Sequence, residues 1–151
     1  MMMKEKIILY TDGGARGNPG PAGAGVLITD SWGKVLSEDS RPLGTMTNNE
    51  AEYSAVIIGL QLLKKNLGGA RLKSAEVELR LDSQLVARQL SGEYQIKEER
   101  LQPFFIKVWN WQIAHQRLRI SYIPRAENKP ADALANQAMD KQTGSTGLFA
   151  G

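Results

Sequence analysis

The order of strand-like and helix-like segments constrains the fold of this chain most. Residues 6–11, 25–29 and 34–40 have strand patterns, and a short turn joins the last two as a hairpin. In the second half, strand patterns at residues 76–81 and 117–123 alternate with helix patterns. Strands at the front and interleaved helices behind predict an α/β fold, with a five-stranded mixed sheet flanked by helices.

Capping residues and glycines place the expected helices. Thr47 and Glu50 form an S/T-x-x-E capping box, which predicts the start of a long helix, and Gly68-Gly69 predicts its end. Shorter helices are expected at residues 84–90 and 104–115, and a last one opens at Asn128. The glycine- and proline-rich segment between the first two strands is expected to be a loop.

Composition narrows the chemistry and the location. The 151 residues include no cysteine, one histidine and a formal net charge of +3. Thiolate zinc sites, iron–sulfur clusters and multi-histidine metal motifs are thereby excluded, and nucleic-acid binding is permitted without being required. No apolar run suits a signal sequence or a membrane span, so we expect a cytoplasmic monomer that does not contact membranes. One domain is expected at residues 1–141, with a mobile C-terminal tail at 142–151.

Four carboxylates stand at the ends of the predicted elements. Asp12 and Asp82 end two strands, and these side chains meet at one sheet edge if the strands pair in parallel. Glu52 and Asp132 lie in the first turns of two helices. Such a group of oxygen ligands suits Mg²⁺ or Mn²⁺. Taken singly, each residue also fits a plain structural role in a turn, a cap or a helix dipole, so periodicity and capping leave the choice open.

Four motifs, in order from Tyr10 to about Met139, resemble those of ribonuclease H, type 1. They are Tyr10-Thr11-Asp12-Gly13-Gly14 with Gly17-Asn18-Pro19-Gly20-Pro21-Ala22-Gly23, then Thr47-Asn48-Asn49-Glu50-Ala51-Glu52, then Asp82-Ser83-Gln84, and last Asn128-Lys129-Pro130-Ala131-Asp132-Ala133-Leu134-Ala135. The third motif alone carries little information, whereas the four together are highly specific. The resemblance implies the ribonuclease H-like fold.

The resemblance also implies an activity and its residues. Members of that family use two Mg²⁺ ions, with Mn²⁺ as a possible substitute, to hydrolyse the RNA strand of RNA–DNA hybrids, leaving 3′-hydroxyl and 5′-phosphate ends. One ion activates the attacking water and the other stabilises the leaving oxygen. The matching metal ligands are Asp12, Glu52, Asp82 and Asp132. The matching substrate contacts are Gly13, Gly14, Asn18, Thr47, Asn48, Asn49 and Gln84, whose amides suit the exposed 2′-hydroxyls of a wide minor groove.

Two departures from the family pattern refine this expectation. Residues 92–116 are nearly neutral, so the basic protrusion of many bacterial members is absent, and Trp109 and Trp111 are expected to pack inside the fold. Arg125 stands where a loop histidine often aids product release, as in the archaeal-like branch of the family. Two alternatives stay open: a non-catalytic nucleic-acid-binding domain on the same fold, and a nuclease that acts on double-stranded RNA or on DNA.

Overall fold

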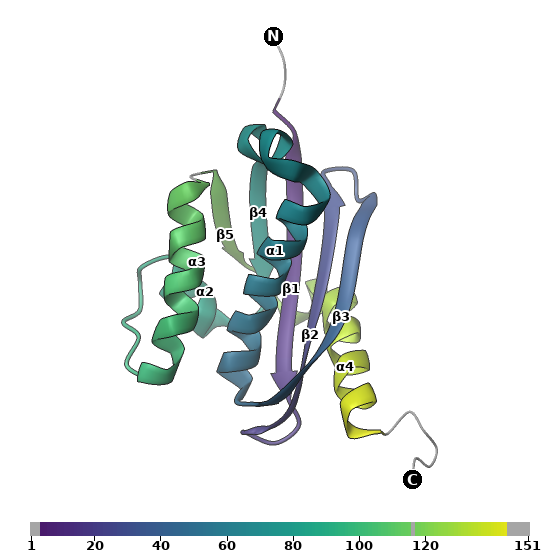
Figure 1. Ribbon diagram of the computed structural model, residues 1–151, viewed down its shortest axis with the longest axis vertical. Helices are drawn as coiled ribbons and strands as arrows, with labels where there is room; N and C mark the ends of the chain where they lie inside the picture. Colours follow the sequence, from purple (N-terminus) through teal and green to yellow (C-terminus); the bar gives the residue numbers. More distant parts are fainter. Residues whose placement is uncertain (1–3, 116, 145–151) are drawn as a thin grey trace.

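A five-stranded sheet forms the centre of the computed structural model, which describes residues 4–115 and 117–144 (Figure 1). The strands lie side by side in the order β3-β2-β1-β4-β5. Their bounds are β1 Lys6–Ala15, β2 Gly20–Asp30, β3 Val35–Met46, β4 Glu76–Leu81 and β5 Leu118–Tyr122. The three front strands pair antiparallel, whereas β1–β4 and β4–β5 pair in parallel. The predicted mixed sheet is confirmed.

Helices cover both faces of the sheet. They are α1 Asn48–Ser74, α2 Gln84–Leu90, α3 Gln102–Ala114 and α4 Lys129–Thr143, with short 3-10 turns η1 Glu99–Leu101 and η2 Arg125–Glu127. The main core lies where α1, α2 and α3 pack on one face, while α4 packs on β2, β3 and β1 (Figure 1). In α3, Trp111 packs against this core as predicted, but Trp109 is 47% exposed and stacks on Phe105.

One expectation about glycine is confirmed and one is corrected. Gly68 has a non-helical φ of 77°, so the first helical part of α1 ends there as predicted, and a second helical part continues after the kink to Ser74. The glycine-rich segment is mostly strand, since β1 runs to Ala15 and β2 starts at Gly20. Its glycines provide room for helices. A Cβ on Gly25 would lie 2.1 Å from the carbonyl oxygen of Ala131 in α4.

The last helix extends into the segment expected to be the tail. Helix α4 continues through Gln142 and Thr143. The Gln142 side chain accepts from the Gly44 nitrogen and donates to the Gly44 carbonyl, both at 2.8 Å, so it is tied to β3. Residues 145–151 of the expected tail lie outside the described residues, and the division into domain and tail stays a prediction. No helix in the described part of the chain combines the length and the apolar character needed to cross a membrane.

Candidate active site

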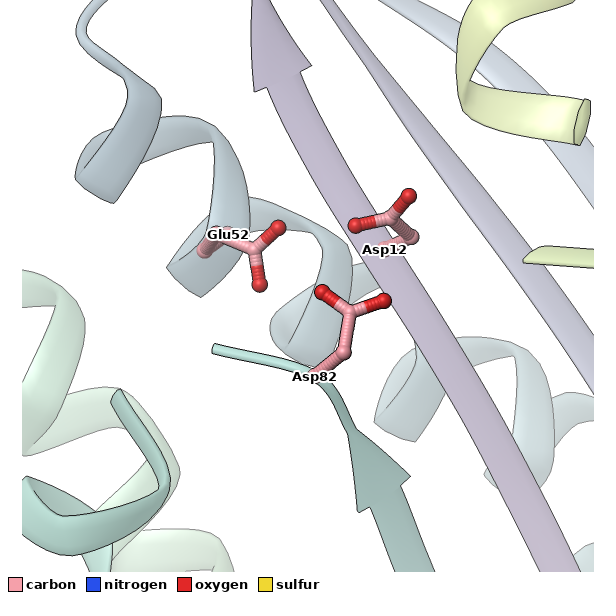
Figure 2. Close-up of side chains that lie close together, drawn as sticks. All are labelled: Asp12, Glu52 and Asp82. Carbon is pink, nitrogen blue, oxygen red and sulfur yellow. The ribbon is translucent and has the colours of Figure 1, made fainter. Parts of the chain in front are cut away.

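Three carboxylates from three different elements converge beside the sheet. Asp12 lies on β1, Glu52 on α1, and Asp82 directly after β4, and Figure 2 shows their carboxyl groups pointing toward one another. One oxygen from each lies within 4.8 Å of the others. The cause is the parallel pairing of β1 with β4: Thr11 pairs with Leu81, so Asp12, which continues β1, and Asp82, which follows the end of β4, lie close together.

Glu52 is fixed by its helix and by the backbone of β1. The predicted capping box is present, because Thr47 accepts from the Glu50 nitrogen at 3.2 Å and Glu50 accepts from the Thr47 nitrogen at 2.9 Å. Oε1 of Glu52 accepts from the Gly13 nitrogen at 2.9 Å. The contact requires a glycine at position 13, because a Cβ there would lie 2.1 Å from the Ala51 carbonyl oxygen. Glu52 therefore does more than favour a helix dipole.

Asp82 is held by a residue whose role the sequence did not reveal. Ser83, not Asp82, caps α2, because its side chain accepts from the Val86 nitrogen. The fully buried Asn128 donates from Nδ2 to Oδ2 of Asp82 and to the carbonyl of Thr11, both at 2.9 Å. The sequence predicts only that Asn128 begins a helix, yet its side chain makes no capping hydrogen bond. Asn128 thus positions Asp82 beside Asp12.

Asp132 lies beside the three-carboxylate group, close enough to Asp12 for their side chains to interact. It stands in the first turn of α4 and, together with Asp12, lines a cleft of about 330 Å³. The sequence-predicted Gly13, Gly14, Asn48 and Arg125 line the same cleft. Its remaining walls are Ala15, Arg16, Asn136 and Met139. Three of the four predicted carboxylates form one tight group, and the fourth faces the same space.

The other predicted substrate residues surround this cleft in different ways. Asn48 and Asn18 tie the β1–β2 turn to α1: the Asn48 nitrogen donates to Oδ1 of Asn18, and Oδ1 of Asn48 accepts from the Ala15 nitrogen, both at 2.9 Å. Asn49 is half-buried in the first turn of α1, and Gln84 is exposed at the start of α2. Thr47 is occupied as the cap. The amides are therefore pre-positioned by the fold.

Burial and mutual repulsion change the protonation of this group. Burial raises the pKa of Asp12 to about 7, the charges of Asp82 and Asp132 add to the rise, and a hydrogen bond with Glu52 opposes it. Burial, followed by the nearby Asp12, raises the pKa of Glu52 well above its usual value, although the Gly13 nitrogen favours the charged form. The fold therefore holds carboxylates together against their own repulsion.

The donor set fits a divalent cation. Oε2 of Glu52 is buried and has no hydrogen-bond partner among the described residues, which is costly unless a ligand satisfies it. The surrounding donors are carboxylate oxygens, which hard divalent cations such as Mg²⁺ prefer. Asp12, Glu52 and Asp82 are the residues that could hold such an ion, with Asp132 available near Asp12.

The raised pKa of Asp12 predicts how stability depends on pH. The carboxyl binds a proton up to about pH 7 in the folded protein, against a usual pKa of 3.8. The metal-free protein should therefore be most stable at acid pH and lose stability as the pH rises from about 4 through about 7. Thermal unfolding in chelator across this range measures the loss. Added Mg²⁺ should raise the melting temperature above about pH 7 and have little effect near pH 5. A melting temperature that rises with pH in chelator would contradict this account.

The fold and the acidic cleft together define a ribonuclease H-like domain. A family model described as reverse transcriptase-like matches residues 10–138. A ribonuclease H1 isolated from compost by a metagenomic approach is 49% identical, with a TM-score of 0.85 over 90% of this chain and 96% of that one. Another structure of that protein, in complex with an RNA/DNA hybrid, is 48% identical, with a TM-score of 0.84 over 89% and 97% of the two chains.

Curated relatives agree with this assignment. Ribonuclease HI of the archaeon Halobacterium salinarum is 36% identical over 135 residues, and a bifunctional protein of Mycobacterium tuberculosis is 38% identical over 136 residues. Each match covers 89% of this chain, but the chain spans only 65% of the first relative's length and 36% of the second's. The chain belongs to the reverse transcriptase-like family, and within it to the ribonuclease H enzymes.

Proposed function

We propose that this chain is a metal-dependent endonuclease that hydrolyses the RNA strand of RNA–DNA hybrids. The observation that carries the proposal is the buried group of Asp12, Glu52 and Asp82, in which an unpartnered carboxylate oxygen faces two other acids. Supporting it, the similar compost enzyme has been crystallised in complex with an RNA/DNA hybrid. A domain that only bound nucleic acid would gain nothing from this arrangement, since uncompensated acids repel a phosphate backbone.

Within this proposal, Asp12, Glu52, Asp82 and Asp132 hold two Mg²⁺ ions, which Mn²⁺ can replace. Bound there, such ions supply an activated water and stabilise the leaving 3′-oxygen, so the products carry 3′-hydroxyl and 5′-phosphate ends. The protein's own groups do the positioning: Asn128 orients Asp82, and the Gly13 nitrogen orients Glu52. This rigid support keeps the acids in place before the substrate arrives.

Substrate recognition is assigned to the cleft and its rim. Gly13, Gly14 and Asn48 line the cleft, and further amides stand at Asn18, which accepts from the Asn48 nitrogen, at Asn49 and at Gln84. An amide both donates and accepts, which suits a 2′-hydroxyl that does the same. Thr47 adds a hydroxyl at the start of α1. We propose that these amides bind the ribose 2′-hydroxyls and that the arginine side chains lining the cleft bind phosphate.

Arg125 is proposed to assist product release. It lines the cleft with Asp12 and Asp132 but cannot act as a general base, because its guanidinium keeps its proton. Its charge can instead attract the phosphate of the leaving product. We expect Arg125→Ala to slow multiple turnover by about fivefold, the equivalent of about 1 kcal/mol, and to slow single-turnover cleavage less. Equal losses in both measurements would assign Arg125 to the chemical step or to binding instead.

The direct test is cleavage of labelled substrates in Mg²⁺ and in Mn²⁺. We expect the RNA strand of an RNA–DNA hybrid to be cut, with 5′-phosphate on the downstream fragment, and double-stranded DNA to stay intact. A wild-type protein that is inert on the hybrid in both metals would refute the proposal. Binding without cleavage would favour the non-catalytic alternative, and cleavage of double-stranded RNA would extend the substrate range.

A further inference from the structure

A second arginine, Arg16, lines the acidic cleft beside the proposed metal ligands. Among the described residues around this cleft, the cationic side chains are Arg16 and Arg125, and they line it together with Asp12 and Asp132. Arg16 enters from the turn between β1 and β2, whereas Arg125 enters from η2 after β5. The sequence motifs drew attention to the glycines and to Asn18 around Arg16, and not to Arg16 itself.

The fold fixes where Arg16 stands. Its backbone nitrogen donates to the Pro21 carbonyl at 2.8 Å, which closes the turn between the two strands. The preceding Ala15 is tied to Asn48 at the start of α1. The Arg16 side chain then crosses to α4, where it forms a salt bridge with Asp140. The guanidinium is thus held between the turn and α4.

A further link connects Arg16 to the acidic centre. Nη2 of Arg16 lies 3.4 Å from Oδ1 of Asn136, and Nδ2 of Asn136 donates to the Asp132 carbonyl at 2.9 Å. Arg16 therefore contacts α4 within the turns that follow Asp132. Its side chain is still 38% exposed, so a ligand in the cleft can reach it.

The energetics favour a ligand for this arginine. An exposed ion pair contributes about 0–1 kcal/mol, so the contact with Asp140 is easily exchanged or shared. A guanidinium has five donors in a fork that matches a phosphate, and a phosphodiester carries the charge that the cleft's acids would otherwise repel. Asp12 and Asp132 need a cation close by if a nucleic-acid strand is to enter.

We infer that Arg16 binds a backbone phosphate of the strand that is cleaved, next to the bond at the acidic centre. The inference rests on the proposed function, because it takes the strand in the cleft to be the RNA strand. The site consists of the Arg16 guanidinium, with Asn136 beside it, and its ligand is a phosphodiester. Asp140 holds the Arg16 side chain in place before the strand binds, and afterwards the guanidinium contacts both Asp140 and the phosphate.

The test compares three variants in steady-state hybrid cleavage and in salt titrations of binding. Arg16→Ala should raise KM by about five- to tenfold with kcat nearly unchanged. The slope of log affinity for the hybrid against log salt concentration should become shallower by about one. Arg16→Lys, which keeps the charge, should recover most of the affinity. The control is Arg71→Ala, which removes another partly exposed arginine, paired with Glu5 at the other end of β1, and should leave KM unchanged.

Three outcomes would overturn the assignment. An unchanged KM in Arg16→Ala, with the wild type active, would show that the side chain does not contact the strand. A fall in kcat at constant KM would show that Arg16 acts by holding α4. A similar rise in KM for Arg71→Ala would show that any lost cation weakens binding. Failure of the proposed function is distinguishable, since the wild type itself would then not cleave the hybrid.

Discussion

Asp12→Asn is expected to abolish hybrid cleavage and to leave the protein as stable as the wild type or more so. Asp12 stands at the centre of the acidic group, between Glu52 and Asp82 on one side and Asp132 on the other. Losing one charged oxygen ligand removes several kcal/mol of metal-assisted stabilisation of the transition state, which is roughly a 10³-fold loss of rate or more. Stability is kept because an uncharged amide of the same shape relieves the repulsion that raises the pKa of Asp12.

Two measurements on the same variant separate these effects. Single-turnover cleavage in Mg²⁺ reports the chemistry, and thermal unfolding in chelator reports the stability. The stabilising effect should grow as the pH rises from about 4 through about 7 and level off above that, where the wild-type carboxyl is fully charged and the amide is not. Asp39→Asn is a suitable control, since Asp39 is paired with Arg41 on β3, outside the acidic group. A large loss of melting temperature in Asp12→Asn would identify Asp12 as a structural residue.

The sequence predicts the framework of the fold because its signals there are local. The helix at residues 84–90 and the strand at 76–81 have the predicted bounds, and the capping box at Thr47 is present. These local signals fail where the structure of a residue depends on a neighbour that is far away in the sequence. Gly23 looks like a loop residue, but it lies within β2, where α4 packs too closely for a Cβ. No local sequence pattern shows that α4 will pack against this strand.

The same limit applies to the candidate site. The four carboxylates could be chosen from motifs, and the structure brings three of them within 4.8 Å and places the fourth near Asp12 in the same cleft. Asn128 and Arg16 could not be chosen, since their contacts join residues far apart in sequence: Asn128 with Asp82, and Arg16 with Asp140. An asparagine before a helix suggests a cap, and an arginine in a turn suggests a solvated charge. Only the pairing of β1 with β4 and the packing of α4 give these residues their partners.

Gly25→Ala is expected to destabilise the protein strongly, although it adds only a single methyl group. The new Cβ would lie 2.1 Å from the Ala131 carbonyl oxygen and 2.6 Å from the Ala135 nitrogen, and both are backbone atoms that cannot rotate away. The strand and α4 must therefore separate, which costs about 3 kcal/mol or more and lowers the melting temperature by roughly 10 °C. Cleavage should fall as well, because Asp132 follows Ala131 directly and moves with the helix.

The contrast with Gly14→Ala makes this prediction specific. Gly14 also lies in a strand that α4 covers, but its Cβ would meet only the flexible Met139 side chain, at an ordinary 3.5 Å. Gly14→Ala should therefore unfold at nearly the wild-type temperature, so that any loss of activity in it reports the cleft rather than the fold. Equal melting temperatures for Gly25→Ala and the wild type would mean that α4 does not approach β2 this closely. The contact that positions Asp132 would then have to be sought elsewhere along the helix.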